Sequence, residues 1–248
     1  MSASRLPIAT VDLGALELNL QLLARAAGGA KLMAVVKANA YGHGASRCGL
    51  RLARCEECSG LAVARVSEAL QLREAGVEIP VLVLGGCGQP EDLQLCSAHK
   101  IAVVVHDWTH VDLLESVVVT NPLKVWVKLD TGMHRLGFSG HELSFVLERL
   151  AAAVTVDEVS CVMTHLANAD DLDDETTAKQ LAQFQQWTNG WPGERSIANS
   201  AGLLGWPGAI GTYVRPGLAL YGISPFLEGV GSSLGLRPVM TLRTRLIA

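Results

Sequence analysis

The chain has 248 residues, of which 49% are hydrophobic and 5% aromatic, and its 20 Lys and Arg against 24 Asp and Glu give a net charge of −4. A chain of this length can bury a large core, either as one barrel or as two smaller domains. The small negative charge, without any basic run, argues against nucleic acid and anionic membranes as partners.

The N-terminal segment, residues 1–7, lacks the apolar core of a secretory leader, and no uninterrupted apolar stretch of the chain is long enough to span a bilayer. We therefore expect a cytoplasmic protein. Asp12 then suits the N-cap of a helix whose leucines recur at helical spacing until Gly28 ends it.

Strand-like and helix-like segments alternate along the rest of the chain. Apolar stretches predict strands at 32–37, 60–64, 80–84, 101–105, 123–129, 158–164, 195–198 and 211–215. Helical periodicity predicts helices at 67–75, 90–98, 109–116, 140–152 and 174–188. This alternation favours an α/β protein of the (β/α)₈ TIM-barrel class. A doubly wound open sheet is the alternative, but no Gly-x-Gly-x-x-Gly fingerprint follows the first strand.

The tail of the chain has a different pattern. A Gly- and Ser-rich stretch begins at Gly229, and apolar and polar residues alternate after Pro238. That alternation predicts a β-strand with one exposed face rather than a barrel helix. We expect this strand to be the first of a β-rich C-terminal domain that lies beyond the present sequence.

One lysine, Lys37, stands at the end of the first predicted strand, and residues 40–44 predict a turn or loop after it. Burying an unpaired ammonium is costly. At the mouth of a parallel sheet, however, desolvation lowers the pKa of a lysine and leaves an amine that attacks carbonyl carbons. Lys37 is therefore a candidate Schiff-base lysine. The alternative is a lysine whose stem lies along the strand while its head reaches water.

Other polar residues follow the ends of predicted strands, where the chemistry of a barrel gathers. They are Tyr41, Lys128, Asp130, Arg135, His165, Asn168, Asn199, Ser200, Arg215 and Gly217. Each alone has an ordinary structural interpretation, since a single histidine is usually a satisfied core residue and Arg-Pro-Gly is a common turn. Their shared location at one face of the barrel predicts a site.

Two of these positions indicate a phosphate group. Ser200 begins a predicted helix and Gly217 opens a short helical turn, and free N–H groups at such points favour phosphate. Barrels often hold phosphate after the seventh and eighth strands. An imine-forming lysine together with a phosphate cradle points to pyridoxal 5′-phosphate (PLP), an electron sink for α-carbanions.

Six cysteines raise the question of a metal site. Cys55 and Cys58 have zinc-like spacing and Cys48 lies nearby, but no second Cys-x-x-Cys pair exists. We therefore expect ordinary reduced thiols and no metal.

Five motifs closely resemble bacterial alanine racemases, in that family's order and over nearly the whole chain. They are MAVVKANAYGHG at 33–44, VKLDTGMHRLG at 127–137, THLANAD at 164–170, ANSA at 198–201 and RPGLALYG at 215–222. The resemblance implies PLP-dependent interconversion of L- and D-alanine, supplying D-alanine for peptidoglycan. It implies an amino acid as substrate and a homodimer for the full-length enzyme. A single-barrel PLP-binding or PLP-homeostasis protein is the alternative.

The resemblance also implies roles for the residues that hold the cofactor. Lys37 would carry PLP as a Schiff base and move the α-proton on one face of the substrate. Tyr41, the Ser200 hydroxyl, and the backbone of Gly217 and Leu218 would bind the phosphate.

Further roles follow for four residues around the ring. Arg135 would contact the phenolic oxygen of PLP and help to position the substrate carboxylate, and His165 would lie against the ring and hydrogen-bond Arg215. Lys128 matches a lysine that is carbamylated in many members. Arg215 would face the pyridine nitrogen, and a guanidinium only donates, so that nitrogen would stay unprotonated. The weaker electron sink suits simple proton exchange at Cα.

Racemisation needs a base on each face of the planar carbanion, or one base that can reach both faces. In the family the second base is a tyrosine from the C-terminal domain of the partner subunit. The chain contains only Tyr41, Tyr213 and Tyr221, and none of them matches that residue. We therefore expect the second base to be absent from this sequence.

The expected domain organisation follows from the resemblance to the alanine racemases. Residues 1–12 would form an N-terminal strand associated with the C-terminal domain, residues 13–230 the PLP-binding barrel, and residues 231–248 the beginning of the C-terminal β domain. The sequence would thus be the N-terminal part of a racemase, with little or no activity alone.

Overall fold

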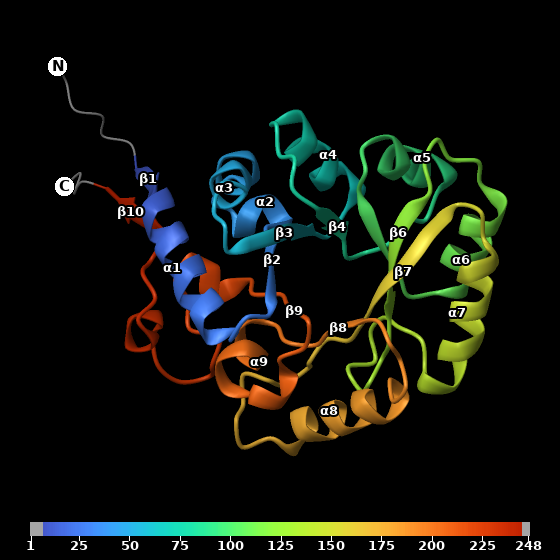
Figure 1. The fold of residues 1–248 in the computed structure, drawn as a ribbon. Coiled ribbons are helices and arrows are strands. Elements are labelled where there is room, and N and C mark those ends of the chain that lie inside the picture. Colours follow the sequence, from blue (N-terminus) through green and yellow to red (C-terminus); the bar gives the residue numbers. More distant parts are fainter. Residues whose placement is uncertain (1–6, 245–248) are drawn as a thin grey trace.

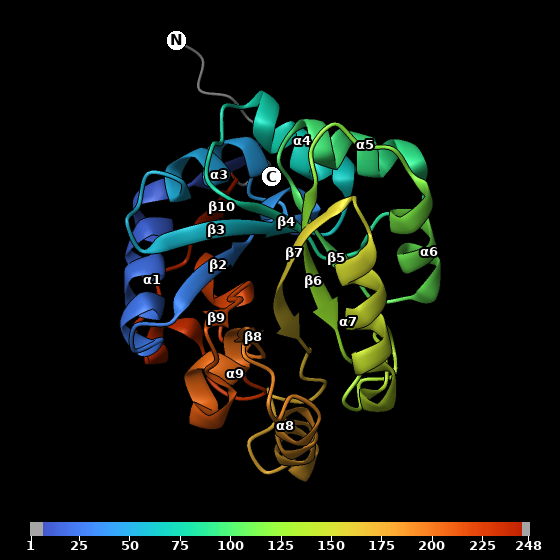
Figure 2. The ribbon, with the colours of Figure 1, turned by 45° about the vertical axis from the view of Figure 1, so that its right-hand side comes forward.

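Eight short strands, most of them apolar, pair side by side in chain order, and the last pairs with the first to close a barrel. All eight pairings are parallel. The computed structural model describes residues 7–244, and Figures 1 and 2 show the barrel from two sides. The strands are β2 (Lys31–Val35), β3 (Cys58–Val63), β4 (Val81–Val83), β5 (Ala102–Val105), β6 (Leu123–Lys128), β7 (Val156–Met163), β8 (Glu194–Ser196) and β9 (Tyr213–Val214).

Helices connect the strands and lie around the outside of the barrel (Figure 2). The α-helices are α1 (Leu13–Ala26), α2 (Lys37–Tyr41), α3 (Ala45–Leu52), α4 (Val66–Glu74), α5 (Pro90–Ala98), α6 (Trp108–Ser116), α7 (Leu143–Ala152), α8 (Glu175–Trp187) and α9 (Ser200–Gly205). Four 3₁₀ turns are η1 (Gly140–Glu142), η2 (Pro207–Ala209), η3 (Leu218–Tyr221) and η4 (Gly231–Leu234). The (β/α)₈ barrel predicted from the sequence is confirmed.

Successive side chains of each strand face opposite sides of the barrel wall, because strand side chains alternate. In β2, Leu32 and Ala34 belong to the core shared with the outer helices, whereas Met33 and Val35 belong to a separate cluster inside the barrel. The inner cluster is completed by Ala62, Leu82, Val104, Trp126, Cys161 and Met163. Side chains from the strands therefore form a packed cluster inside the barrel.

Helix α1 begins at the predicted N-cap, because the Asp12 carboxylate accepts hydrogen bonds from the Gly14 and Ala15 amides. The buried Asn19 side chain binds this helix to the segment that follows β9. Its amide donates to the carbonyls of Leu220 and Arg237, and its oxygen accepts from the Arg237 amide. Helix α1 thus fixes the segment that follows β9.

The predicted strand after Pro238 is present as β10 (Met240–Arg243), and it pairs antiparallel with β1 (Ile8–Val11). This two-stranded sheet lies outside the barrel (Figure 1). All four residues of β10 are exposed. The outer parts of the two predicted terminal segments, residues 1–6 and 245–248, lie outside the described residues.

The segment after β2 differs most from the expectation. The strand ends at Val35 rather than at residue 37, and the predicted loop over 40–44 begins inside α2. Helix α3 was not predicted. Its buried face, Ala45, Cys48, Gly49 and Leu52, has helical spacing, but three of these four side chains are small, which weakens the apolar pattern.

Within the described part of the chain, no helix has the length and apolarity needed to cross a membrane.

Candidate active site

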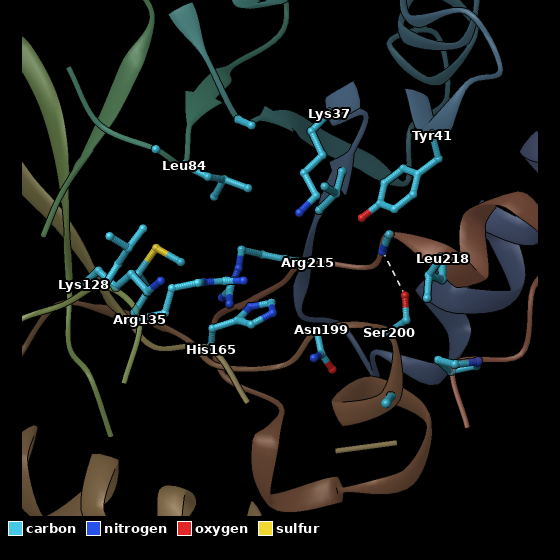
Figure 3. Close-up of a pocket in the computed structure, with 18 of the residues that line it drawn as sticks. Lys37, Tyr41, Leu84, Lys128, Arg135, His165, Asn199, Ser200, Arg215 and Leu218 are labelled. Carbon is cyan, nitrogen blue, oxygen red and sulfur yellow. Dashed lines mark hydrogen bonds between the residues drawn. The ribbon is translucent and has the colours of Figure 1, made fainter. Parts of the chain in front are cut away.

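A cavity of about 400 Å³ lies at the ends of the barrel strands. Figure 3 shows side chains from several βα segments converging on it. Among the predicted site residues, those that line the cavity are Lys37, Tyr41, Lys128, Arg135, His165, Asn199, Ser200, Arg215, Gly217 and Leu218. The barrel therefore brings together residues that are up to 181 positions apart in the sequence (218 − 37).

Strand alternation explains why these side chains meet. An inward-facing residue near a strand end is followed two positions later by another residue on the same side. Trp126 is followed by Lys128, Met163 by His165, and the inner-face Tyr213 by Arg215. The inner face of the barrel thus continues from an apolar core into a polar cavity.

Lys37 opens a left-handed turn. From Ala38 to Tyr41 the φ angles lie between 51° and 55°, and Gly42 follows at 86°. Non-glycine residues enter this region singly, at a cost of roughly 1–2 kcal/mol each, so four in succession store considerable strain. The turn sets the positions of Lys37 at its start and Tyr41 at its end. Figure 3 shows the Lys37 amine and the Tyr41 hydroxyl pointing into the cavity.

Aromatic packing supports the far end of this turn. The buried Tyr221 ring lies 5.1 Å from the Tyr41 ring and stacks on His43 at 4.5 Å, measured between ring centroids. The Tyr221 hydroxyl donates to the Val35 carbonyl at 3.0 Å, and its burial raises its pKa. Burial also raises the pKa of Tyr41, so its hydroxyl is a neutral donor at neutral pH.

Ser200 and the segment after β9 form a small cradle. The Ser200 Oγ accepts hydrogen bonds from the Gly217 amide at 2.9 Å and from the Ala219 amide at 3.2 Å. With these bonds made, the hydroxyl still has its own hydrogen to donate. A Cβ on Gly217 would lie 2.5 Å from the Tyr41 Oη, so this position has no room for a side chain.

Arg215 is a buried cation in the cavity wall. Its Nη1 donates to the Ser196 Oγ, and its Nη2 donates to the carbonyls of Thr164 at 2.6 Å and Ile197 at 3.3 Å. Burial lowers the pKa of Arg215 to about 10, so the guanidinium stays protonated at neutral pH. The described residues show no hydrogen bond between Arg215 and His165, so the contact that the resemblance implied stays a prediction.

Several cations crowd the same wall. Burial lowers the pKa of His165 well below its ordinary value, and the positive charges of Arg215, Lys128 and Arg135 lower it further. Burial likewise lowers the pKa of Lys128 to about 8, with Arg135 and Arg215 as further causes. The site therefore contains a neutral imidazole and a lysine that is easily deprotonated. It has an excess of positive charge that suits an anionic ligand.

Three predicted polar residues have local structural roles. The Asp130 carboxylate accepts from the amides of Gly132 and His134, and Asn168 donates to Asp174 next to helix α8. Neither Asp130 nor Asn168 lines the cavity. Asn199 does line it, but its side chain caps α9 by accepting from the Gly202 amide at 2.9 Å.

The sequence pattern did not predict two residues that lie near the site. Glu68 on α4 accepts a hydrogen bond from the Ala38 amide, directly after Lys37. Gln180 on α8 is buried, donates to the His165 carbonyl at 3.1 Å and accepts from the Ala167 amide at 2.9 Å. A signal existed for Gln180, because it occupies the buried face of its helix between Thr177 and Phe184.

The cysteines of the described residues are not grouped as metal ligands. All six are free, and within residues 7–244 no group of three or more His, Cys, Asp or Glu side chains could hold a metal ion. Burial raises the pKa of Cys48 to about 11 and of Cys58 to about 12, so both are poorly reactive thiols.

Comparison with known proteins gives a consistent result. Residues 11–225 match the family model described as alanine racemase, N-terminal domain. The curated alanine racemase of Nitrosococcus oceani is 47% identical over 243 residues, which are 98% of this chain and 67% of that protein.

Solved structures agree with the sequence relatives. The biosynthetic alanine racemase of Pseudomonas aeruginosa superposes with a TM-score of 0.91 at 36% identity, over 96% of this chain and 66% of that one. The alanine racemase of Bartonella henselae, solved with covalently bound pyridoxal phosphate, superposes with a TM-score of 0.83 at 28% identity. The superposition covers 97% of this chain and 69% of the Bartonella henselae protein. The chain thus spans about two thirds of the length of these relatives.

Proposed function

The chain belongs to the alanine racemase family, a family of PLP-dependent isomerases, through its N-terminal domain, and on this premise we propose that it binds PLP and contributes one half of an alanine racemase active site. The observation that carries the proposal is the convergence of Lys37, Tyr41, Ser200 and Arg215 on one cavity. D-alanine made by the complete enzyme would serve peptidoglycan synthesis. A single-barrel PLP-homeostasis protein is not favoured, since the relatives are racemases.

The residues of the cavity fit PLP. The phosphate end would be held by the Tyr41 hydroxyl, the Ser200 hydroxyl and the backbone around Gly217 and Leu218, where a Cβ at Gly217 would fill the space. The Arg215 guanidinium, fixed by three hydrogen bonds, would face the ring nitrogen as a donor. An anionic cofactor also offsets the positive charge of Lys128, Arg135 and Arg215.

When bound, PLP would supply an electron sink for the charge left at Cα of an amino acid. Lys37 would hold the cofactor, and its amine would remove or return the α-proton on one face. Because Arg215 stays protonated, it would donate to the ring nitrogen without protonating it. Arg135 would bind the substrate carboxylate, and His165, neutral at neutral pH, would lie against the ring without adding charge.

The second base is proposed to come from outside these residues. Tyr41 supports the phosphate cradle, and Tyr221 is buried with its hydroxyl on the Val35 carbonyl. Tyr213 does not line the cavity, and the Lys31 amine lies 5.1 Å from the centre of its ring. We propose that residues 1–12 and 231–248, which include the paired β1 and β10, belong to the C-terminal domain of a homodimeric enzyme. The barrel itself would be residues 13–230.

The test of this function is a titration of the chain with PLP, followed by an assay of D-alanine formation from L-alanine. We expect saturable binding with a visible absorption band of protein-bound PLP and little or no turnover. A chain that binds no PLP would contradict the proposal, and full turnover would contradict the assignment of the second base to another domain.

Gly217→Ala is expected to weaken PLP affinity by roughly tenfold. The ψ angle of −85° at this position lies outside the regions that alanine favours, and the new Cβ would displace the Tyr41 hydroxyl, 2.5 Å away. PLP titration measures the effect. Gly217→Ala displaces the Tyr41 hydroxyl and Tyr41→Phe removes it, so the double variant should bind PLP no worse than whichever single variant has the lower affinity. Additive losses of affinity would show that Gly217 acts separately from Tyr41.

Lys128 is proposed to be carbamylated by CO₂. Only the neutral amine attacks CO₂, which forms an N–C bond and releases a proton, and a pKa of about 8 makes that amine available near neutral pH. The resulting negative charge would attract Arg135 instead of repelling it. In ¹³C-bicarbonate at pH 8, a protein-bound carbamate signal should appear in NMR spectra, fade as the pH falls below 7, and be missing from Lys128→Met. An equal signal in that variant would place the carbamate elsewhere.

A further inference from the structure

The Glu68 carboxylate joins two loops of the cavity wall. One oxygen accepts a hydrogen bond from the Ala38 amide at 2.6 Å. The other accepts from the Ala64 amide at 2.8 Å and from the Arg65 amide at 3.1 Å. Ala38 follows β2 and Ala64 follows β3, so one side chain on α4 ties together the segments after two neighbouring strands.

The bond to Ala38 acts on the peptide group attached directly to Lys37. The Ala38 amide belongs to the Lys37–Ala38 peptide, and its orientation sets the first left-handed residue of the turn. Four consecutive non-glycine residues do not hold this conformation by their own preference. The turn therefore requires external contacts to stay in place.

Packing offers little support at the start of the turn. Ala38 and Asn39 are both exposed, whereas the aromatic contacts of Tyr41 act at the other end. Asn39 is tied forward to helix α3, through its side-chain oxygen and the Ala45 amide at 2.8 Å. Glu68 is the contact that ties the beginning of the turn to a different part of the barrel.

We propose that Glu68 is a positioning residue for the PLP site: its carboxylate fixes the left-handed turn that holds Lys37 and Tyr41 at their places in the cavity. This inference rests on the proposed function of the cavity. Glu68 touches neither cofactor nor substrate in this role. It acts through the backbone on which Lys37 stands.

Glu68 also stabilises the start of α4, because its carboxylate accepts a hydrogen bond from the amide of the N-cap residue Arg65. Glu68→Gln separates the two roles. A glutamine oxygen can keep the bonds to Ala64 and Arg65, since Gln can replace Glu as the acceptor at this position of a helix. Its NH₂ group then faces the Ala38 amide, donor against donor, and that bond is lost. Glu68→Ala removes all three bonds.

The expected result for Glu68→Gln is a melting temperature close to that of the wild type, with PLP affinity weakened about tenfold, as loss of a hydrogen bond to a charged group predicts. Exchange of the Ala38 amide hydrogen, measured by NMR without PLP, should accelerate by a similar factor. Glu68→Ala should show the same two changes and also a lower melting temperature. Glu74→Ala, exposed at the far end of α4, is the matched control and should change none of these values.

A rescue experiment tests the physical cause. Glycine adopts the left-handed region readily, so Ala38→Gly should restore part of the PLP affinity lost in Glu68→Gln. Wild-type exchange and wild-type affinity in Glu68→Gln would overturn the proposal, and so would faster exchange with unchanged affinity. If the wild type itself bound no PLP, the proposed function would fail. The exchange rates would still decide whether Glu68 holds the turn.

Discussion

Replacing Lys37 with alanine is expected to abolish the covalent retention of PLP and to lower any racemase activity of the assembled enzyme by about a thousandfold or more. The amine is the proposed attachment point and one of the two proposed bases. Its side chain points into the cavity (Figure 3), and it is only partly buried, so the fold should tolerate the change. Borohydride reduction of the PLP-loaded chain, followed by peptide mass spectrometry, should find the cofactor on Lys37.

Lys128→Met is the matched control for this experiment, because Lys128 is the other lysine among the residues lining the same cavity. It should leave the borohydride-trapped cofactor on Lys37. Trapping on Lys128, or undiminished trapping in Lys37→Ala, would contradict the assignment. Trapping on Lys37 without racemisation in the wild-type chain would agree with a second base supplied by another domain.

Replacing Arg215 with leucine is expected to lower the free energy of unfolding by about 2–4 kcal/mol and also to weaken PLP binding. Three buried acceptors, the Ser196 hydroxyl and the carbonyls of Thr164 and Ile197, would lose their donor. Relief from burying a charge offsets part of this loss, since burial already lowers the pKa of Arg215. Urea unfolding and PLP titration measure the two effects.

Arg195→Leu provides a control with a similar structural loss away from the cavity. Arg195 donates to the carbonyls of Thr188 at 2.9 Å and Trp191 at 2.7 Å, and it does not line the cavity. It should lose stability without losing intrinsic PLP affinity under conditions where it is folded. If both variants lost affinity in proportion to their stability, Arg215 would have no specific role at the cofactor. Arg215→Lys, which keeps charge but not the planar fork, should recover only part of the affinity.

The barrel could be predicted because its signal is local and repeated. Most strands are short apolar runs, although β8 is Glu-Arg-Ser, and most of the following helices have their own period. The eight strand positions therefore emerged from the pattern with shifts of one to a few residues at their ends. Helix α3 was not predicted because its buried face consists mainly of small residues, Ala45, Cys48 and Gly49, with Leu52 as the large apolar side chain. The strand ends were imprecise because hydrogen-bond pairing with neighbours, not composition, determines where a strand stops.

The sequence predicted which residues belong to the candidate site better than it predicted how they are arranged. Polar residues after apolar strands identified Lys37, His165 and Arg215, which line the cavity. The same rule selected Asp130 and Asn168, which instead satisfy backbone and side-chain groups next to them. A polar residue after a strand faces either the cavity or its own turn, and the path of the loop decides which. Asp130 has the same parity as Lys128, yet its carboxylate binds the amides of its own turn.

The fold class, the family and most of the polar residues of the cavity follow from the sequence, because they depend on periodicity and motifs that are readable along one chain. The tertiary structure alone decided three further features. It set the left-handed turn from Ala38 to Tyr41, the three hydrogen bonds of Arg215 and the tie between Glu68 and the Ala38 amide. Each depends on contacts between segments that are distant in sequence, and those contacts stabilise conformations and burials that the local residues would not adopt alone.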